Sequence, residues 1–147
     1  MKKVYLAITV TLLAVVFTTV LYSQLRDNRL ATIEGVHKFI SSEESVGFAI
    51  YRPDYSQYTV NTSEEFLSIL QIESWKKETG RWSIDMVIWD EVIIISYIDG
   101  GRTYIENGKA VTYWEYAVPV VGKRYTIYTI PIEVQQELIE YVLENYA

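Results

Sequence analysis

Residues 102–118 read RTYIENGKAVTYWEYAV, and Asn107-Gly108 inside this segment is the strongest hairpin signal in the chain. Asparagine and glycine accept the positive φ angles of a type I′ turn, which joins two antiparallel strands. β-Branched and aromatic residues flank the turn on both sides, as is typical of strands. The segment therefore predicts a β-hairpin with strands over Arg102–Glu106 and Ala110–Val118.

Further strands are predicted on both sides of this hairpin. Val92–Ile98 precedes it across the turn Asp99-Gly100-Gly101, and Tyr125–Ile130 follows it after Gly122-Lys123. Three turns that join four strands predict an antiparallel meander. Ile84–Trp89 has the same strand-like composition and adjoins the meander.

The chain ends in a predicted amphipathic helix over Ile132–Tyr146, with Pro131 at its start. At 100° per residue, one face of this helix is apolar and suits packing on a sheet. The apolar face holds Val134, Leu138, Ile139, Tyr141, Val142, Leu143 and Tyr146. The opposite side carries Glu133, Glu137, Glu140 and Glu144, which we interpret as a solvated stripe.

Two short strands and one helix are predicted before the meander. The strands are Val46–Tyr51 and Tyr58–Val60, and Thr62 and Glu65 after them have the spacing of a capping box. The resulting fold class is α+β. It consists of an antiparallel meander sheet on which the C-terminal amphipathic helix and one earlier short helix pack.

The segment Val4–Tyr22, VYLAITVTLLAVVFTTVLY, is uncharged and follows Lys2 and Lys3. As a helix it is about 28 Å long, close to the thickness of a bilayer's hydrocarbon core. It predicts a single transmembrane helix. The alternative is a signal peptide cleaved near Ser23, but Leu21 would then stand where the cleavage pattern requires a small residue.

The short basic tail predicts a cytoplasmic N-terminus and an outward-facing domain at the cell membrane. The expected organisation is a cytoplasmic tail over residues 1–3, a transmembrane anchor over 4–22, a membrane-proximal stalk over 23–35 and an extracytoplasmic α+β domain over 36–147. Residues 23–35 are alternatively a continuation of the anchor helix. The anchor also carries a stripe of small residues, which is either a helix-docking face or a tolerated composition. The stripe consists of Ala7, Thr11, Ala14 and Thr18.

Composition excludes several functional classes. Without Lys2 and Lys3, the 13 basic residues fall to 11 against 19 acidic ones, a net charge of −8 that disfavours nucleic acid as a partner. The chain has no cysteine, which excludes disulfides and thiolate chemistry. An exported domain without disulfides is typical of bacterial surface proteins.

No residue pattern predicts a catalytic, metal or cofactor site. The single histidine, His37, lies far in sequence from any nucleophile motif, and we interpret it as a structural or solvated residue. The candidate carboxylates are Asp85, Asp90, Glu91 and Asp99. They fall where strands begin or end, and their spacing predicts neither glycoside hydrolysis nor calcium binding.

Aromatic residues are the one compositional feature that points to binding, with 13 tyrosines and 4 tryptophans. Large rigid rings are enriched at protein interfaces, although cross-strand pairs also stabilise sheets. The candidate binding surface is formed by Tyr104, Tyr113, Trp114, Tyr116, Tyr125 and Tyr128.

These observations predict an anchored domain that binds a protein or ligand without catalysis, as accessory, sensor or immunity-type proteins do at a bacterial envelope. The alternative is a pilin-like or secretion-machinery subunit, in which an apolar helix carries a β-domain. A small anchored hydrolase is the third and weakest hypothesis, because no catalytic constellation supports it.

Overall fold

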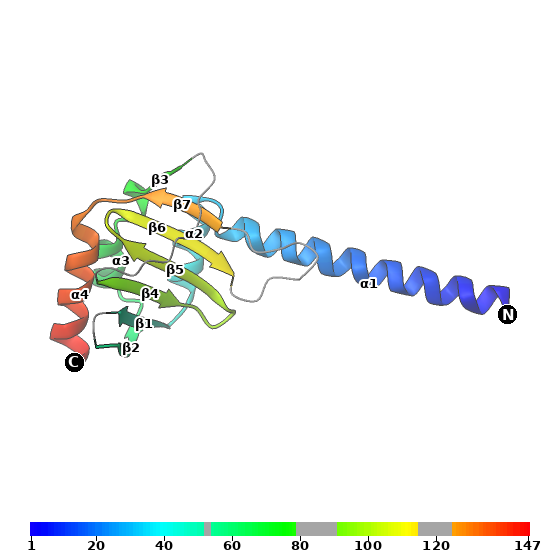
Figure 1. The fold of residues 1–147 in the computed structure, drawn as a ribbon, viewed down its shortest axis with the longest axis horizontal. Coiled ribbons are helices and arrows are strands. Elements are labelled where there is room, and N and C mark those ends of the chain that lie inside the picture. Colours follow the sequence, from blue (N-terminus) through cyan, green and yellow to red (C-terminus); the bar gives the residue numbers. More distant parts are fainter. Residues whose placement is uncertain (52–53, 79–90, 115–124) are drawn as a thin grey trace.

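The structure is a computed structural model that describes residues 1–51, 54–78, 91–114 and 125–147, with residues 23–28 described by their helical backbone alone. The elements in chain order are α1 (Lys2–Arg29), α2 (Ile33–Ser42), β1 (Ser45–Tyr51), β2 (Ser56–Asn61), α3 (Glu64–Leu70), a 3-10 turn (Ile72–Ser74), β3 (Lys76–Lys77), β4 (Val92–Ser96), β5 (Gly101–Glu106), β6 (Lys109–Trp114), β7 (Tyr125–Thr129) and α4 (Glu133–Tyr146). Figure 1 shows α1 projecting from one end of a twisted sheet and α4 lying across the opposite end.

The sheet has seven strands in the order β2-β1-β4-β5-β6-β7-β3, and every neighbouring pair is antiparallel. Strands β4 to β7 form the predicted meander. The β1–β2 hairpin extends the sheet because β1 pairs with β4, and β3 adds two residues at the other edge. The predicted α+β class is therefore confirmed.

The β5–β6 turn has the predicted conformation. Asn107 and Gly108 have φ angles of 46° and 74°, and Glu106 pairs directly with Lys109. Positive φ at both central residues defines the type I′ turn. The Gly108 carbonyl also accepts a hydrogen bond from the Ile130 amide at 2.8 Å, which connects the hairpin turn to the end of β7.

All described helices after α1 contribute to one hydrophobic core on a single face of the sheet. Side chains in a strand alternate between faces, so each strand sends every second residue to this core. The largest fully buried side chains include Trp75, Tyr128, Phe48, Phe66 and Leu30. From α4 the core receives Val134, Leu138, Ile139 and Val142, while the predicted glutamate stripe is exposed.

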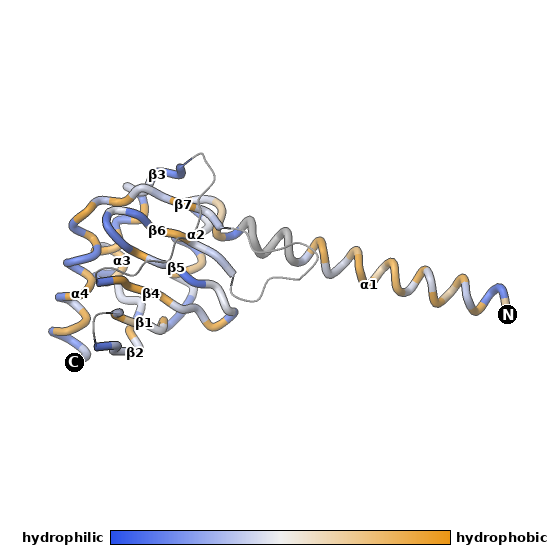
Figure 2. Tube along the Cα trace, in the orientation of Figure 1, coloured by the Kyte–Doolittle hydropathy of each residue, from blue (hydrophilic) through white to orange (hydrophobic). Residues whose placement is uncertain are grey.

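Helix α1 contains the segment Lys2–Tyr22, which is long and apolar enough to cross a membrane and has none of its residues buried in the domain. A signal sequence meets the same criteria of length and composition. Figure 2 shows mostly apolar residues along this part of the helix, whereas apolar and polar residues alternate through the rest of the chain that it colours.

Of the two alternatives for residues 23–35, the structure supports a continuation of the anchor helix over a separate stalk. The α1 backbone stays helical to Arg29, Leu30 is 2 % exposed in the core, and α2 already begins at Ile33. Helix α2 was not predicted at all. Thr32 caps it by accepting a hydrogen bond from the Gly35 amide at 3.0 Å, and it buries Val36, Phe39 and Ile40.

The predicted capping box at Thr62 is also wrong by one residue. Ser63 is the N-cap of α3 and accepts a hydrogen bond from the Phe66 amide at 3.2 Å, whereas the Thr62 hydroxyl donates to the Glu43 carbonyl. Three predicted features lie outside the described residues, namely the strand Ile84–Trp89, residues 115–118 of the strand after Gly108, and the turn at Gly122-Lys123.

Candidate functional site

The six aromatic residues predicted to form one surface do not share a face. Trp114 is 2 % exposed and Tyr128 is fully buried, and both belong to the core. The prediction that these two residues form part of a binding surface is therefore wrong. Tyr116 lies outside the described residues. Tyr104, Tyr113 and Tyr125 are half-buried on the opposite side of the sheet.

Strand register explains this division. In β6, Trp114 follows Tyr113 and so points to the opposite face. Phe39 of α2 packs edge-on against Trp114 with ring centroids 5.5 Å apart, which places Trp114 among the helices. Tyr113 pairs with Arg102 of β5 and with Tyr125 of β7, so these three residues lie on the other face.

We call this second surface the tyrosine face and define it by Arg102, Tyr104, Glu106, Tyr113 and Tyr125. None of the described helices packs on it, because α2, α3 and α4 all join the core on the other side (Figure 1). The Tyr113 and Tyr125 rings lie 5.4 Å apart at 45°, a geometry that stabilises aromatic pairs.

Polar contacts order the rest of the tyrosine face. The Tyr104 hydroxyl donates to Glu106 Oε2 at 2.7 Å, and Arg102 donates to Ser96 Oγ at 2.7 Å. Burial, together with the hydrogen bond to Glu106, raises the pKa of Tyr104 above its ordinary value. The face thus combines tyrosine rings and an arginine, residue types enriched at interface hot spots, with a glutamate.

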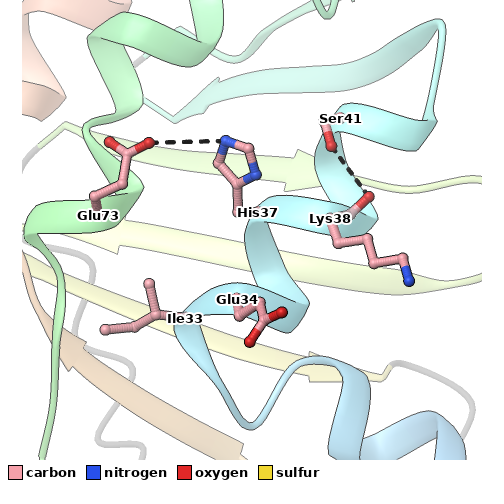
Figure 3. A pocket seen from close by; sticks show the side chains of 6 residues that line it. All are labelled: Ile33, Glu34, His37, Lys38, Ser41 and Glu73. Atoms are coloured by element: carbon pink, nitrogen blue, oxygen red, sulfur yellow. Dashed lines mark hydrogen bonds and ion pairs between the residues drawn. The ribbon is translucent and has the colours of Figure 1, made fainter.

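A second candidate is the open pocket of about 660 Å³ around His37, seen in Figure 3. It is lined by Ile33, Glu34, His37, Lys38, Ser41 and Glu73. His37 Nε2 and Glu73 Oε1 are 3.9 Å apart, and their side chains are 45 % and 85 % exposed. This grouping was not predicted from the sequence, since Glu73 reaches α2 from the 3-10 turn.

The geometry of this pocket does not form an activated nucleophile. Ser41 lies four residues after His37 on α2, but its hydroxyl donates to the Lys38 carbonyl at 3.2 Å. Nucleophilic catalysis requires the hydroxyl to be hydrogen-bonded to its base. An ion pair this exposed contributes little to stability and leaves the imidazole solvated.

Of the predicted carboxylate candidates, the two that the structure describes lie at opposite ends of β4. Asp99 is exposed in the β4–β5 turn, Glu91 is half-buried before β4, and Asp85 and Asp90 lie outside the described residues. Among the residues that the structure describes, no group of three or more potential ligands could hold a metal ion.

The junction between α1 and the domain is a further ordered site that the sequence did not predict. The Leu30 carbonyl accepts hydrogen bonds from the Thr112 hydroxyl at 2.9 Å and from the Tyr128 hydroxyl at 2.8 Å, and both bonds are buried. Lys77 Nζ donates to the Ala31 carbonyl at 2.9 Å. We call these five residues the Leu30 junction.

Arg29 strengthens the attachment of the helix. Its guanidinium carbon lies 5.4 Å from the ring centroids of both Phe39 and Trp114, within the range of cation–π attraction. Gly35 approaches so closely that a Cβ atom there would be 2.1 Å from the Arg29 carbonyl oxygen. The last turn of α1 is therefore packed against both α2 and the sheet.

The small-residue stripe of α1 is exposed along its length, at Ala7, Thr11, Ala14 and Thr18. The Thr11 and Thr18 hydroxyls donate to the Ala7 and Ala14 carbonyls at 2.9 and 2.8 Å. Thr9 and Thr19, on other sides of the helix, form the same bonds to the residues four positions earlier. The stripe therefore has no hydrogen bonding that distinguishes it from the rest of the helix.

Comparison with protein-family models, with curated proteins and with solved structures finds no match to this chain.

Proposed function

We propose that this chain is a single-pass membrane protein whose outward-facing domain binds a protein partner through the tyrosine face, without catalysis. The observation that carries the proposal is the division of the sheet into two faces. The described helices cover one face, and the other presents half-buried tyrosines beside Arg102 and Glu106.

Retention of the N-terminal helix is supported by the continuity of α1. The backbone is helical through Ser23, the position of the alternative cleavage, and proteolytic cleavage concentrates in exposed loops instead. The Leu30 junction also supports retention, since it joins the end of α1 to the strands that carry Tyr113 and Tyr125.

A protein is favoured over a small ligand because the tyrosine face is a sheet surface and not one of the described pockets. Small molecules bind in concave sites that enclose most of their surface. Tyrosine and arginine are instead the residues that most often dominate protein–protein binding energy. The adjacent Glu106 adds a charge of opposite sign and therefore specificity for the partner's own charges.

Site-specific photocrosslinking in intact cells tests this proposal. A benzoylphenylalanine in place of Tyr125 samples the tyrosine face, and one in place of the exposed Glu140 on α4 is the matched control. We expect a discrete adduct from position 125 that the Arg102→Glu substitution abolishes, and no adduct of that mass from position 140. An adduct of equal yield from both positions would contradict binding through this face.

A further inference from the structure

The length of α1 beyond its apolar segment sets the height of the domain above a bilayer. This inference rests on the proposed membrane anchoring. Seven helical residues, 23–29, follow Tyr22, and at 1.5 Å per residue they extend about 10 Å. The polar layer on each side of the hydrocarbon core is about 5–8 Å thick. The domain therefore begins at the outer boundary of the headgroups.

The Leu30 junction determines which end of the domain faces the lipid. Two buried hydroxyls donate to the Leu30 carbonyl and attach the end of α1 to the sheet. Figure 1 shows that α1 leaves the sheet at the end where β4 stops and β5 starts. The β4–β5 turn is therefore directed toward the membrane.

Contacts between side chains place this turn next to the end of α1. Gly101, the first residue of β5, pairs with Trp114, and a Cβ atom on Gly101 would be 3.0 Å from the Trp114 ring. Trp114 in turn contacts Arg29. Tyr97, on the other side of the turn, packs edge-on against Phe39 with ring centroids 5.2 Å apart, and Phe39 also contacts Arg29.

Ile98 stands at the tip of this turn and is 87 % exposed, the highest value among the large apolar side chains described in the domain. The turn that carries it is rigid. The Gly100 amide donates to the Tyr97 carbonyl at 3.0 Å, and the buried Tyr97 hydroxyl is 2.5 Å from Thr103 Oγ1. An isolated exposed isoleucine is ordinary on a protein surface. Ile98 is of interest because its turn is directed toward the membrane.

We propose that Ile98 enters the headgroup layer of the bilayer and forms a second contact between the domain and the membrane. An apolar side chain gains free energy to the extent that it leaves water for this layer. Asp99 follows Ile98, and burial together with the charge of the nearby Asp99 raises the pKa of Glu43. These carboxylates make the surface of a zwitterionic lipid the suitable partner and oppose anionic lipid.

Fluorescence quenching of the full chain in vesicles tests the contact between Ile98 and the bilayer. The chain has no cysteine, so Ile98→Cys and Ile132→Cys each give a single labelling site for an environment-sensitive nitrobenzoxadiazole. Ile132 is the matched control, because it is 74 % exposed beside α4 at the far end of the sheet. Both labelled proteins are reconstituted in phosphatidylcholine vesicles with and without spin-labelled phosphatidylcholine.

We expect the spin-labelled lipid to lower the emission at position 98 by about twofold or more and to leave position 132 nearly unchanged. Equal quenching at the two positions in protein that floats with the vesicles would overturn the Ile98 contact while leaving the anchor intact. A chain that does not float with the vesicles would contradict the anchoring itself, and with it this inference.

Discussion

The Tyr128 hydroxyl, on β7 near the C-terminus, donates a hydrogen bond at 2.8 Å to the carbonyl of Leu30, the residue that follows α1. Tyr128 is fully buried, so this bond is shielded from water. Thr112 donates to the same oxygen from β6. One backbone atom is thus the meeting point of the N-terminal helix and two strands of the sheet.

Removing both the Tyr128 and the Thr112 hydroxyl should lower the free energy of unfolding by more than the sum of the two single removals. We expect Tyr128→Phe and Thr112→Val each to lower the free energy of unfolding by about 1 kcal/mol, since either donor alone still satisfies the Leu30 carbonyl. The double variant leaves a buried acceptor unpaired, which adds about 1–3 kcal/mol. Urea unfolding of the full chain in detergent measures this, and Tyr55→Phe, at an exposed site, is the control. Strictly additive losses would refute the shared acceptor.

Alkaline pH should weaken the fold. Burial raises the pKa of Tyr128 to about 12 from its ordinary value of 10.0, although its bond with Thr112 opposes the shift. Because the folded state holds the proton more tightly, the stability from Tyr128 is fully present below pH 10 and is lost as the pH rises to 12. Tyr128→Phe should show a shallower decline in urea midpoint over that range. An identical decline in both proteins would contradict this assignment.

Gly35 should tolerate no side chain. The Cβ atom of Gly35→Ala would be 2.1 Å from the Arg29 carbonyl, so backbone must move to relieve the overlap. We expect a loss of about 1–3 kcal/mol in unfolding free energy. Gly47→Ala is the matched control, since its nearest contact would be 3.4 Å from the Ser96 side chain. If both variants unfold at the same denaturant concentration, the close packing of α2 on α1 is disproved.

Adjacent residues of β6 should have separable roles. Trp114→Ala removes a core ring and is expected to cost about 3–5 kcal/mol, whereas the half-buried Tyr113 should cost closer to 1 kcal/mol when changed to alanine. Tyr113→Ala should instead reduce the crosslinked adduct from position 125. Thermal unfolding and adduct yield, measured on both variants, distinguish the two effects. If only Trp114→Ala lost the adduct, binding would lie on the face that the helices cover, and the tyrosine face would be excluded.

The meander could be predicted because its signals are local. Asn107 and Gly108 specify their turn without reference to the rest of the chain, and the apolar stripe of α4 specifies its buried side. Helix α2 carried comparable signals, namely the cap at Thr32 and the apolar residues at positions 36, 39 and 40. It was missed because the polar residues before it favoured a stalk.

The face to which each aromatic side chain points could not be predicted in the same way. Alternation along β6 separates Tyr113 from Trp114, but it does not reveal which of the two meets the helices. That choice depends on the contact of Trp114 with Phe39, a residue of the unpredicted α2. The role of the Leu30 carbonyl as an acceptor could not be predicted either, because no sequence pattern connects a backbone carbonyl to distant hydroxyls.

The Leu30 carbonyl also has a consequence for the order of events during synthesis. Its two donors, Thr112 and Tyr128, follow it by 82 and 98 residues. At ordinary translation rates the second donor leaves the ribosome about 5–20 seconds after Leu30. Until both donors have been made, the Leu30 carbonyl cannot form its two native hydrogen bonds, so the end of α1 docks fully on the sheet only after β7 has been synthesised.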